Sequence, residues 1–296
     1  MSMRVFAALL ASWIGIAQGA NAPGSSVAST AAAARAATTP ATSTVSATAG
    51  NDWLMLVATN STDAAREAEF NAWYDDIDIP DVLEVPGYQR ARRGLRLGTA
   101  AAPVSALPPD EGRYVALYDI ASGNIDKTII EMLMATRKME ARGRTTDLLK
   151  VTERVYYLRL APAVERGTAS AHDTPDSARA EATDEYLYVE RFDCCNDLAT
   201  EQRFKDWYDR QHVSGVLASA GFERATRYEL YRVLMIEPKT ASRYLTIYEL
   251  QAGSPEEAVQ RMDAARASLR DAAPKQISFA ESGSTMFRKI RDVRAP

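Results

Sequence analysis

The sequence has few of the residues that usually carry metal, redox or nucleophilic chemistry. Of its 296 residues only two are histidine and two are cysteine, and the cysteines, Cys194 and Cys195, are adjacent. Adjacent cysteines rarely form a disulfide because the bridge geometry is strained, so we expect them to pack at a strand end. The sequence also has no His or Cys spacing typical of zinc, no glycine-rich phosphate loop and no Gly-x-Ser-x-Gly motif.

Strong charge and long hydrophobic runs are lacking too. The formal net charge is −4, which gives no indication of a nucleic-acid partner, because such proteins usually carry a basic patch. The apolar run Val5 to Ala17 is too short to span a membrane but has the length of a signal-peptide core. Small residues follow it at Ala20-Asn21-Ala22, a candidate cleavage site. We therefore expect no membrane span in the mature chain.

The N-terminal region divides into two predicted parts. Residues 1–22 are predicted to be a signal peptide, and residues 23–50, almost entirely Ala, Ser, Thr, Pro and Gly, a disordered linker. This predicts a periplasmic or secreted protein. The alternative is a cytoplasmic protein whose true start lies near Asn51.

What the chain does contain is an internal repeat. The segment FNAWYDDIDIPDVLEVPGYQRARRG, from Phe70, is matched by FKDWYDRQHVSGVLASAGFERATRY, from Phe204. Residues 113–118 then recur as residues 243–248, so only a loop has changed length. His212 stands where the first copy has Asp78. The positions that agree at a constant offset of 134 residues are Phe70, Trp73, Tyr74, Asp75, Gly87, Arg90, Ala91 and Arg93.

Each copy is predicted to contain strand, helix, strand, strand, helix and strand, which is the ferredoxin-like βαββαβ order. In the first copy, strands are expected at 52–57, 88–97, 113–120 and 151–160. The first helix is expected at 63–85, with a break or kink at Pro80. The second helix is expected at 122–142, with Ile129, Met132, Leu133 and Met139 facing inward. In the second copy, strands are expected at 184–192, 222–233, 242–250 and 285–290, and helices at 200–218 and 255–273, the last capped by Ser254.

The predicted fold class is α+β. Repeat 1 covers residues 51–160 and repeat 2 residues 184–296, with a polar linker over 161–183 that contains His172, expected to be a solvated bystander. A four-stranded sheet with helices on one face leaves its other face bare, so the two sheets are expected to pack on each other. The result would be an intramolecular α/β-barrel pseudo-dimer with helices outside and a cavity between the sheets. A further homodimer is left open.

The repeated motif resembles a known family. A helix with Trp-Tyr-x-x-x-His, a turn and a strand with aromatic-x-x-Ala-x-Arg are similar to the dimeric α/β-barrel superfamily, its EthD-like branch in particular. Residues 207–227 match this pattern well, and residues 73–93 match it with Asp78 in place of the histidine. Repeat 2 in turn has Ser214 and Ala220 where repeat 1 keeps prolines. The superfamily includes cofactor-free monooxygenases, lactone isomerases, polyketide cyclases and haem-binding enzymes.

Three residues are candidate catalytic groups. Tyr208 and His212 are four apart on a helix and so share a face. The resemblance implies that this histidine lies near a cavity mouth, where an imidazole can exchange a proton near neutral pH while Tyr208 orients it or stabilises an oxyanion. Asp78 could act as a base of raised pKa. The alternatives are a packing histidine and, for Asp75, Asp76, Asp78 and Asp81, a solvated acidic face or a divalent-cation site, although we expect no metal.

Four further residues are candidate substrate-binding groups. Arg93 and Arg227 match the strand motif of the family and, if they point inward, could hold a substrate carboxylate or phenolate. Tyr74 and Trp207 would contact the substrate beside them. Outward arginines and purely structural aromatic residues are the alternatives.

The sequence thus favours a cofactor-independent enzyme of isomerase, lyase or cyclase type. It would perform acid/base chemistry on a small hydrophobic or aromatic substrate in the cavity between the sheets. The alternatives are a non-catalytic binding protein for a hydrophobic small molecule, a cofactor-free monooxygenase and a haem-binding relative.

Overall fold

The computed structural model describes residues 51–98, 107–108, 110–166, 184–195, 197–218, 221–236, 241–272 and 279–296. The predicted signal peptide, the segment that follows it and His172 lie outside the described residues, so those assignments stay predictions. Within the described part, no helix combines the length and apolar character needed to cross a membrane.

Repeat 1 has the predicted order of elements. Its strands are β1 (Asp52–Ser61), β2 (Tyr88–Arg96), β3 (Tyr114–Ala121) and β4 (Leu149–Arg159). Its helical segments are η3 (Ala64–Arg66), α1 (Glu67–Trp73), η4 (Tyr74–Asp78), α2 (Ile79–Leu83) and α3 (Ile125–Ala141). Asn124 begins α3 because its side chain accepts a hydrogen bond from the backbone N–H of Lys127.

Repeat 2 has the same order. Its strands are β6 (Asp184–Cys194), β7 (Phe222–Ile236), β8 (Tyr244–Ala252) and β9 (Phe279–Arg294), and its helical segments are α4 (Leu198–Trp207), η6 (Tyr208–His212), α5 (Val213–Ala218) and α6 (Pro255–Ala272). The predicted cap of α6 is confirmed, since Ser254 Oγ accepts from the backbone N–H of Glu257 at 3.1 Å. One short strand, β5 (Val164–Glu165), pairs with β7 inside the segment predicted to be a linker.

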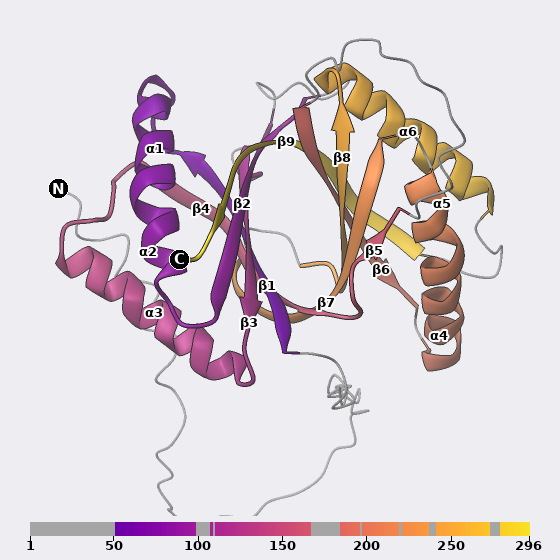
Figure 1. The fold of residues 1–296 in the computed structure, drawn as a ribbon, viewed down its shortest axis with the longest axis horizontal. Coiled ribbons are helices and arrows are strands. Elements are labelled where there is room, and N and C mark those ends of the chain that lie inside the picture. Colours follow the sequence, from indigo (N-terminus) through magenta and orange to yellow (C-terminus); the bar gives the residue numbers. More distant parts are fainter. Residues whose placement is uncertain are drawn as a thin grey trace, which may run out of the picture. The chain divides into compact units, whose positions relative to one another are not determined.

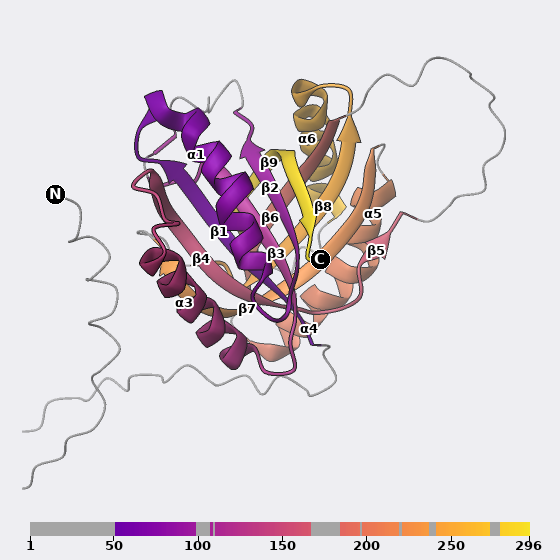
Figure 2. The same ribbon diagram turned by 60° about the vertical axis from the view of Figure 1, so that its left-hand side comes forward.

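The strands close into an antiparallel barrel. The hydrogen-bonded order is β4-β1-β3-β2-β9-β6-β8-β7, and β7 pairs back with β4. Each repeat contributes four neighbouring strands, and each of the two equivalent seams, β2 with β9 and β4 with β7, joins the second strand of one repeat to the last strand of the other. The helices lie outside the barrel, α1, α2 and α3 over one half and α4, α5 and α6 over the other (Figures 1 and 2). The predicted barrel of two ferredoxin-like repeats is confirmed.

Side chains alternate across the barrel wall and so form three separate cores. The interior holds mostly aliphatic residues, among them Leu54, Leu117 and Ile247. Two further cores lie between the helices and the outer face of the wall, one for each repeat. Tyr118 and Tyr248 belong to these outer cores and not to the interior. Any site built on them therefore lies under the helices.

Two local predictions are wrong. Leu133 is 44% exposed, because α3 buries the stripe through Ile129 and Met132, and Leu133 falls about 100° away from it. The expectation that Cys194 and Cys195 do not pair is also wrong, since they are joined as a vicinal disulfide, although they do pack at the end of β6 as predicted. Cys195 leaves β6 with a φ of 71°, so the two side chains do not point to opposite faces as neighbours in a strand would.

Candidate functional site

In both repeats the first helix contains a π-helical turn at the same place. The segment Tyr74–Asp78 follows α1, and Tyr208–His212 follows α4. The backbone N–H of Ile79 donates to the carbonyl of Tyr74, and that of Val213 donates to Tyr208, five residues back instead of four. Single π turns are frequent at functional sites. The predicted shared face is confirmed, since the rings of Tyr208 and His212 stack with centroids 4.4 Å apart.

Proline does not cause the π turn. The sequence predicts a break or kink at Pro80, but the chain stays helical through it and the irregularity lies in the turn before it. Pro80 occupies the first turn of α2, where its missing N–H is tolerated. Ser214 takes the same position in repeat 2, which forms the same π turn.

In repeat 2 a buried carboxylate organises the side chains under this turn. Glu190, from β6, is 6% exposed and its Oε2 receives three hydrogen bonds. Tyr208 donates its hydroxyl to Oε2, Tyr248 donates at 3.3 Å, and His212 Nε2 lies 3.1 Å away. Thr246 Oγ1 is 2.9 Å from the Tyr208 hydroxyl. Because an ionised carboxylate only accepts, the hydrogen at Nε2 belongs to the imidazole.

His212 is held on several sides. It is 5% exposed, stacks on Tyr208 and has the ring of Trp207 at 5.4 Å. With Nε2 held by Glu190, its remaining nitrogen is Nδ1, which is buried and has no hydrogen-bond partner among the described residues. A buried polar atom without a partner costs free energy and calls for an explanation, such as catalysis or a ligand.

The tyrosines beside Glu190 are donors. Burial raises the pKa of Tyr208 well above its usual value, and the negative charge of Glu190 raises it further. Burial also raises the pKa of Tyr248, with Tyr208 and Glu190 adding to the effect. Both hydroxyls therefore keep their protons at physiological pH and stabilise the negative charge of Glu190.

Repeat 1 places a carboxylate differently. The register pairs Val57 with Ala116 where repeat 2 pairs Glu190 with Thr246, so the strand carboxylate is missing. The carboxylate of repeat 1 is Asp78, on the π turn, whose Oδ2 accepts from Tyr118 at 3.2 Å. Burial raises the pKa of Asp78 to about 6, although Arg154 and Tyr118 lower it.

The strand arginines also differ between the repeats. Arg93 is fully buried, and its Nη1 and Nη2 donate to Asp75 at 3.0 Å and to Asn71 at 2.6 Å. Its guanidinium lies 4.4 Å from the ring centroid of Tyr74. This arginine is thus a structural part of the repeat 1 core, with both terminal nitrogens used.

Arg227, the equivalent in repeat 2, is less well satisfied. It is 7% exposed, pairs through Nη1 with Asp209 and lies 4.7 Å from the ring centroid of Tyr208. Its Nε and Nη2 have no hydrogen-bond partner within the described part of the chain. Nε of Arg93 has no partner there either, so the difference between the repeats is at Nη2: Lys205 stands where repeat 1 has Asn71, the acceptor for Nη2, and Lys205 pairs with Glu201 instead.

The predicted residues are thus brought together in two groups, one in each repeat. His212, Tyr208, Trp207 and Arg227 gather in repeat 2, and Asp78, Tyr74 and Arg93 in repeat 1. Both groups lie between helix and sheet, whereas the sequence predicts a site between the sheets. The prediction failed because most of the buried aromatic side chains of the strands point toward the helices, whereas the interior of the barrel is mostly aliphatic.

Sequence reasoning missed Glu190, the centre of the repeat 2 group. A signal was present: Tyr186, Tyr188, Glu190 and Phe192 alternate along one face of β6, and a carboxylate in such an aromatic stripe is unusual.

The acidic residues of the repeat 1 helix do not form a common site. Asp81 is held by Arg144 through two hydrogen bonds of 2.6 and 2.7 Å, Asp75 pairs with Arg93, and Asp78 faces Tyr118. Among the described residues there is no group of three or more His, Cys, Asp or Glu that could hold a metal ion.

Comparison with known proteins gives likeness only in structure. No protein-family model and no curated protein sequence matches the chain. An anthrone oxidase-like protein is similar with a TM-score of 0.46 and 10% identity, over 85% of this chain and 96% of that chain. A mutant chlorite dismutase from Candidatus Nitrospira defluvii gives 0.42 and 10%, over 83% and 94%. A DypB variant from Rhodococcus jostii in complex with haem gives 0.43 and 12%, over 80% and 93%.

Proposed function

We propose that the chain, whose strand order and register give the dimeric α/β-barrel fold, is a cofactor-independent acid/base enzyme with its chemistry at His212 in repeat 2. The observation that carries the proposal is the buried Glu190–His212 pair, with Nε2 held at 3.1 Å and Nδ1 left without a partner among the described residues.

The geometry gives each group of this pair a part in proton transfer. Glu190 keeps the hydrogen on Nε2, so Nδ1 carries the lone pair that takes a proton from the substrate. The imidazolium that forms is stabilised by the carboxylate beside it, and it can return the proton to another substrate atom. Isomerisation, elimination and cyclisation each need such a transfer. Tyr208 does not contact the substrate in this scheme, since its hydroxyl is used by Glu190 and Thr246.

The substrate class follows from the surroundings of His212. Trp207, Phe192 and Phe204 make the neighbourhood aromatic, and Arg227 supplies a buried positive charge with two unused N–H groups. A small aromatic or otherwise hydrophobic molecule whose deprotonated form is an enolate or phenolate meets both requirements. Because His212 is 5% exposed, binding requires neighbouring side chains to move. The EthD-like resemblance of residues 207–227 agrees with this proposal.

The same base would serve a cofactor-free monooxygenase. Removal of a proton from a phenol-like substrate by His212 is also the step that prepares such a substrate for attack on molecular oxygen. Oxygen consumption in the presence of substrate separates this alternative from the isomerase, lyase and cyclase reactions.

The residues around His212 do not fit a haem. Nε2 is occupied by Glu190, and the ring is packed against Tyr208 and Trp207, so neither the usual ligand atom nor an open ring face is presented.

The proposal is tested by hydrogen exchange. A panel of small lactones, phenols and aromatic ketones is incubated with the protein in deuterated water, and deuterium incorporation at carbon is followed by mass spectrometry. His212→Gln is expected to lower the exchange rate at least about a hundredfold, because a positioned general base contributes about 10² to 10⁴. Asp78→Asn, at the equivalent position of repeat 1, is the matched control and should keep the rate.

Two results would overturn the assignment. An unchanged rate in His212→Gln would remove His212 as the base. Retention of a panel compound by wild type without any exchange or other turnover would support the alternative of a non-catalytic binding protein.

A further inference from the structure

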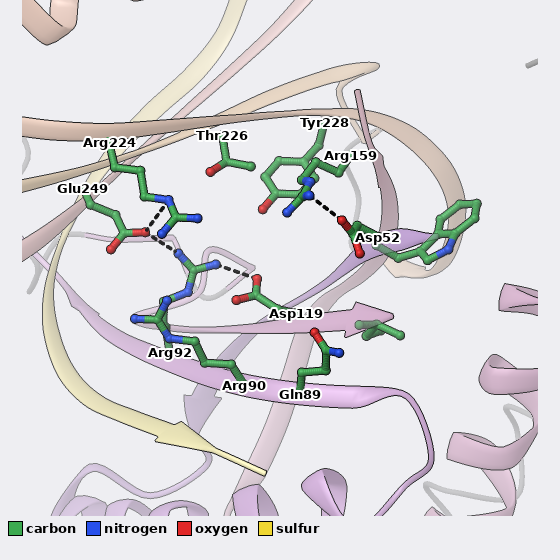
Figure 3. A pocket seen from close by; sticks show the side chains of 12 residues that line it. Asp52, Gln89, Arg90, Arg92, Asp119, Arg159, Arg224, Thr226, Tyr228 and Glu249 are labelled. Atoms are coloured by element: carbon green, nitrogen blue, oxygen red, sulfur yellow. Dashed lines mark hydrogen bonds and ion pairs between the residues drawn. The ribbon is translucent and has the colours of Figure 1, made fainter. Parts of the chain in front are cut away.

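A pocket of about 110 Å³ opens at one mouth of the barrel, on the interior side of the wall. It is lined mainly by charged side chains, in contrast to the aliphatic interior beyond it. Figure 3 shows four arginines around it, Arg90, Arg92, Arg159 and Arg224, which come from both repeats. The Glu190–His212 pair belongs to the core on the other side of the wall, so this pocket is separate from the proposed active site.

The pocket lies where the two repeats meet, and its lining is nearly symmetric. Arg90 is opposite Asp119 in the β2–β3 register, and Arg224 is opposite Glu249 in the β7–β8 register. These two pairs occupy equivalent positions of the repeats. The symmetry is broken at Arg92, because repeat 2 has Thr226 there. Threonine is much smaller than arginine, so the space that a second guanidinium would fill is open.

Arg92 forms the charged floor of this pocket. It is 3% exposed, and it donates to Asp119 at 2.7 Å and, across the barrel interior, to Glu249 at 3.0 Å. Its Nε has no hydrogen-bond partner in the part of the chain that the structure describes. The same holds for Nε of Arg224, whose contacts with Glu165 and Glu249 are long, at 3.4 and 4.0 Å.

Two hydroxyl groups complete the lining. Thr226 and Tyr228 come from β7 and line the same pocket as Arg92 (Figure 3). Burial raises the pKa of Tyr228 to about 12, although Arg92 lowers it, so this hydroxyl keeps its proton. The pocket therefore offers guanidinium and hydroxyl donors together.

Each carboxylate in the lining already has an arginine partner. Asp52 pairs with Arg159, and Asp119 and Glu249 share Arg92. A cation would have to displace these arginines, whereas an anion can use the donors that they leave open. Arginine is suited to this task because its planar fork matches the oxygens of carboxylate and phosphate.

We propose that the barrel-mouth pocket binds a small oxyanion, a carboxylate or phosphate group, between Arg92, Arg224 and the hydroxyls of Thr226 and Tyr228. The volume suits an ion or a molecule of a few heavy atoms. Since the ligand contacts both repeats, its binding also links them across the interior.

The test is calorimetric titration of the full chain with sodium phosphate and, separately, with sodium acetate and sodium malonate, at constant ionic strength. Sodium chloride is the control for screening. The phosphate and carboxylate arms identify the source of the oxyanion. We expect saturable binding in one arm at least, and none with chloride. No saturable binding in either arm would overturn the proposal.

Variants locate the binding. Thr226→Arg places in repeat 2 the residue that repeat 1 has, fills the opening, and should lower the affinity at least tenfold. Thr226→Ser keeps the space and the hydroxyl and should stay within about threefold of wild type. If Thr226→Arg does not fold, Arg224→Gln is compared with Arg90→Gln, because Arg90 is already held bidentately by Asp292 at 2.6 and 2.8 Å.

The two arginine variants are expected to differ in the size of their effect. Arg224→Gln should weaken binding severalfold to tenfold, and Arg90→Gln should change it much less. Equal affinities in Thr226→Arg and wild type, or in Arg224→Gln and wild type, would place the anion elsewhere. His212→Gln should leave the affinity unchanged, so the result does not depend on the proposed function.

Discussion

The two repeats share the same arrangement of helices and strands and differ in the side chains between them. Tyr114 donates to Glu67 at 2.5 Å in repeat 1, and the equivalent Tyr244 donates to Glu201 at 2.5 Å in repeat 2. Both repeats also have the π turn. The carboxylate beneath this turn, however, comes from the helix in repeat 1 and from the strand in repeat 2.

This difference decides which half can carry chemistry. In repeat 1 the terminal nitrogens of Arg93 are paired, and Asp78 faces a tyrosine. In repeat 2 the strand carboxylate frees the helix position for His212, and both His212 and Arg227 keep nitrogens without partners among the described residues. Departures from complete hydrogen bonding are expected at functional sites, so we propose that repeat 2 is the functional half and that repeat 1 mainly closes the barrel.

The largest effect is expected from giving repeat 2 the strand residue of repeat 1. Glu190→Val leaves Tyr208, Tyr248 and His212 without their shared acceptor, so the free energy of unfolding should fall by about 3 to 5 kcal/mol. Urea denaturation measures this. Glu190→Gln keeps an acceptor and should cost clearly less. Equal losses in the two variants would mean that Glu190 acts by its volume and not by its hydrogen bonds.

A smaller effect is expected when repeat 1 is given the residue of repeat 2 beside its buried arginine, Arg93. Asn71→Lys gives repeat 1 the residue that repeat 2 has and removes the acceptor of Arg93 Nη2, which should cost about 1 to 3 kcal/mol. Thermal denaturation detects it. The counterpart Lys205→Asn should not destabilise by this amount, since Arg227 gains an acceptor while Lys205 loses a partly exposed ion pair. A larger loss in Lys205→Asn would contradict the comparison.

A pH-dependent effect is expected at Asp78. Its folded pKa of about 6 lies above the ordinary 3.8, so the folded state binds the proton more tightly than the unfolded state. The stabilisation is fully present below about pH 4 and is lost as pH rises through about 6. Asp78 keeps some exposure, so we expect a loss of about 1 to 2 kcal/mol rather than the full amount. Asp78→Asn should flatten the stability profile between pH 4 and 6, and an unaltered profile would refute the raised pKa.

The smallest effect is expected from Pro80→Ser, which introduces the residue of repeat 2. Because repeat 2 forms the same π turn with Ser214, the free energy of unfolding should change by less than about 1 kcal/mol. Hydrogen exchange of the η4 amides would show whether the turn persists. Loss of protection there would mean that proline holds the turn in repeat 1.

The sequence was sufficient to predict the order of helices and strands, because that order depends on the periodic pattern of apolar residues. The order of elements, the duplication and the pairing of His212 with Tyr208 follow from spacing alone. The side of the sheet did not follow, because most strands carry large apolar residues on both faces, and the sequence does not say which face the helices cover. Glu190 was missed because it lies outside the repeated motif. The barrel-mouth pocket was missed because it depends on the contact of Arg92 with Glu249, and their strands are not neighbours in the sheet.

The most direct test of the account is the tautomer of His212, read from the nitrogen chemical shifts of ¹⁵N-histidine-labelled protein. The chain has only two histidines, so the spectrum of His212→Gln assigns the signals. On the alkaline side of the titration of the ring, we predict a protonated Nε2 and a bare Nδ1, and Glu190→Gln should weaken this preference. A proton on Nδ1 in wild type would contradict the account, because the nitrogen left for the substrate could then not act as a base.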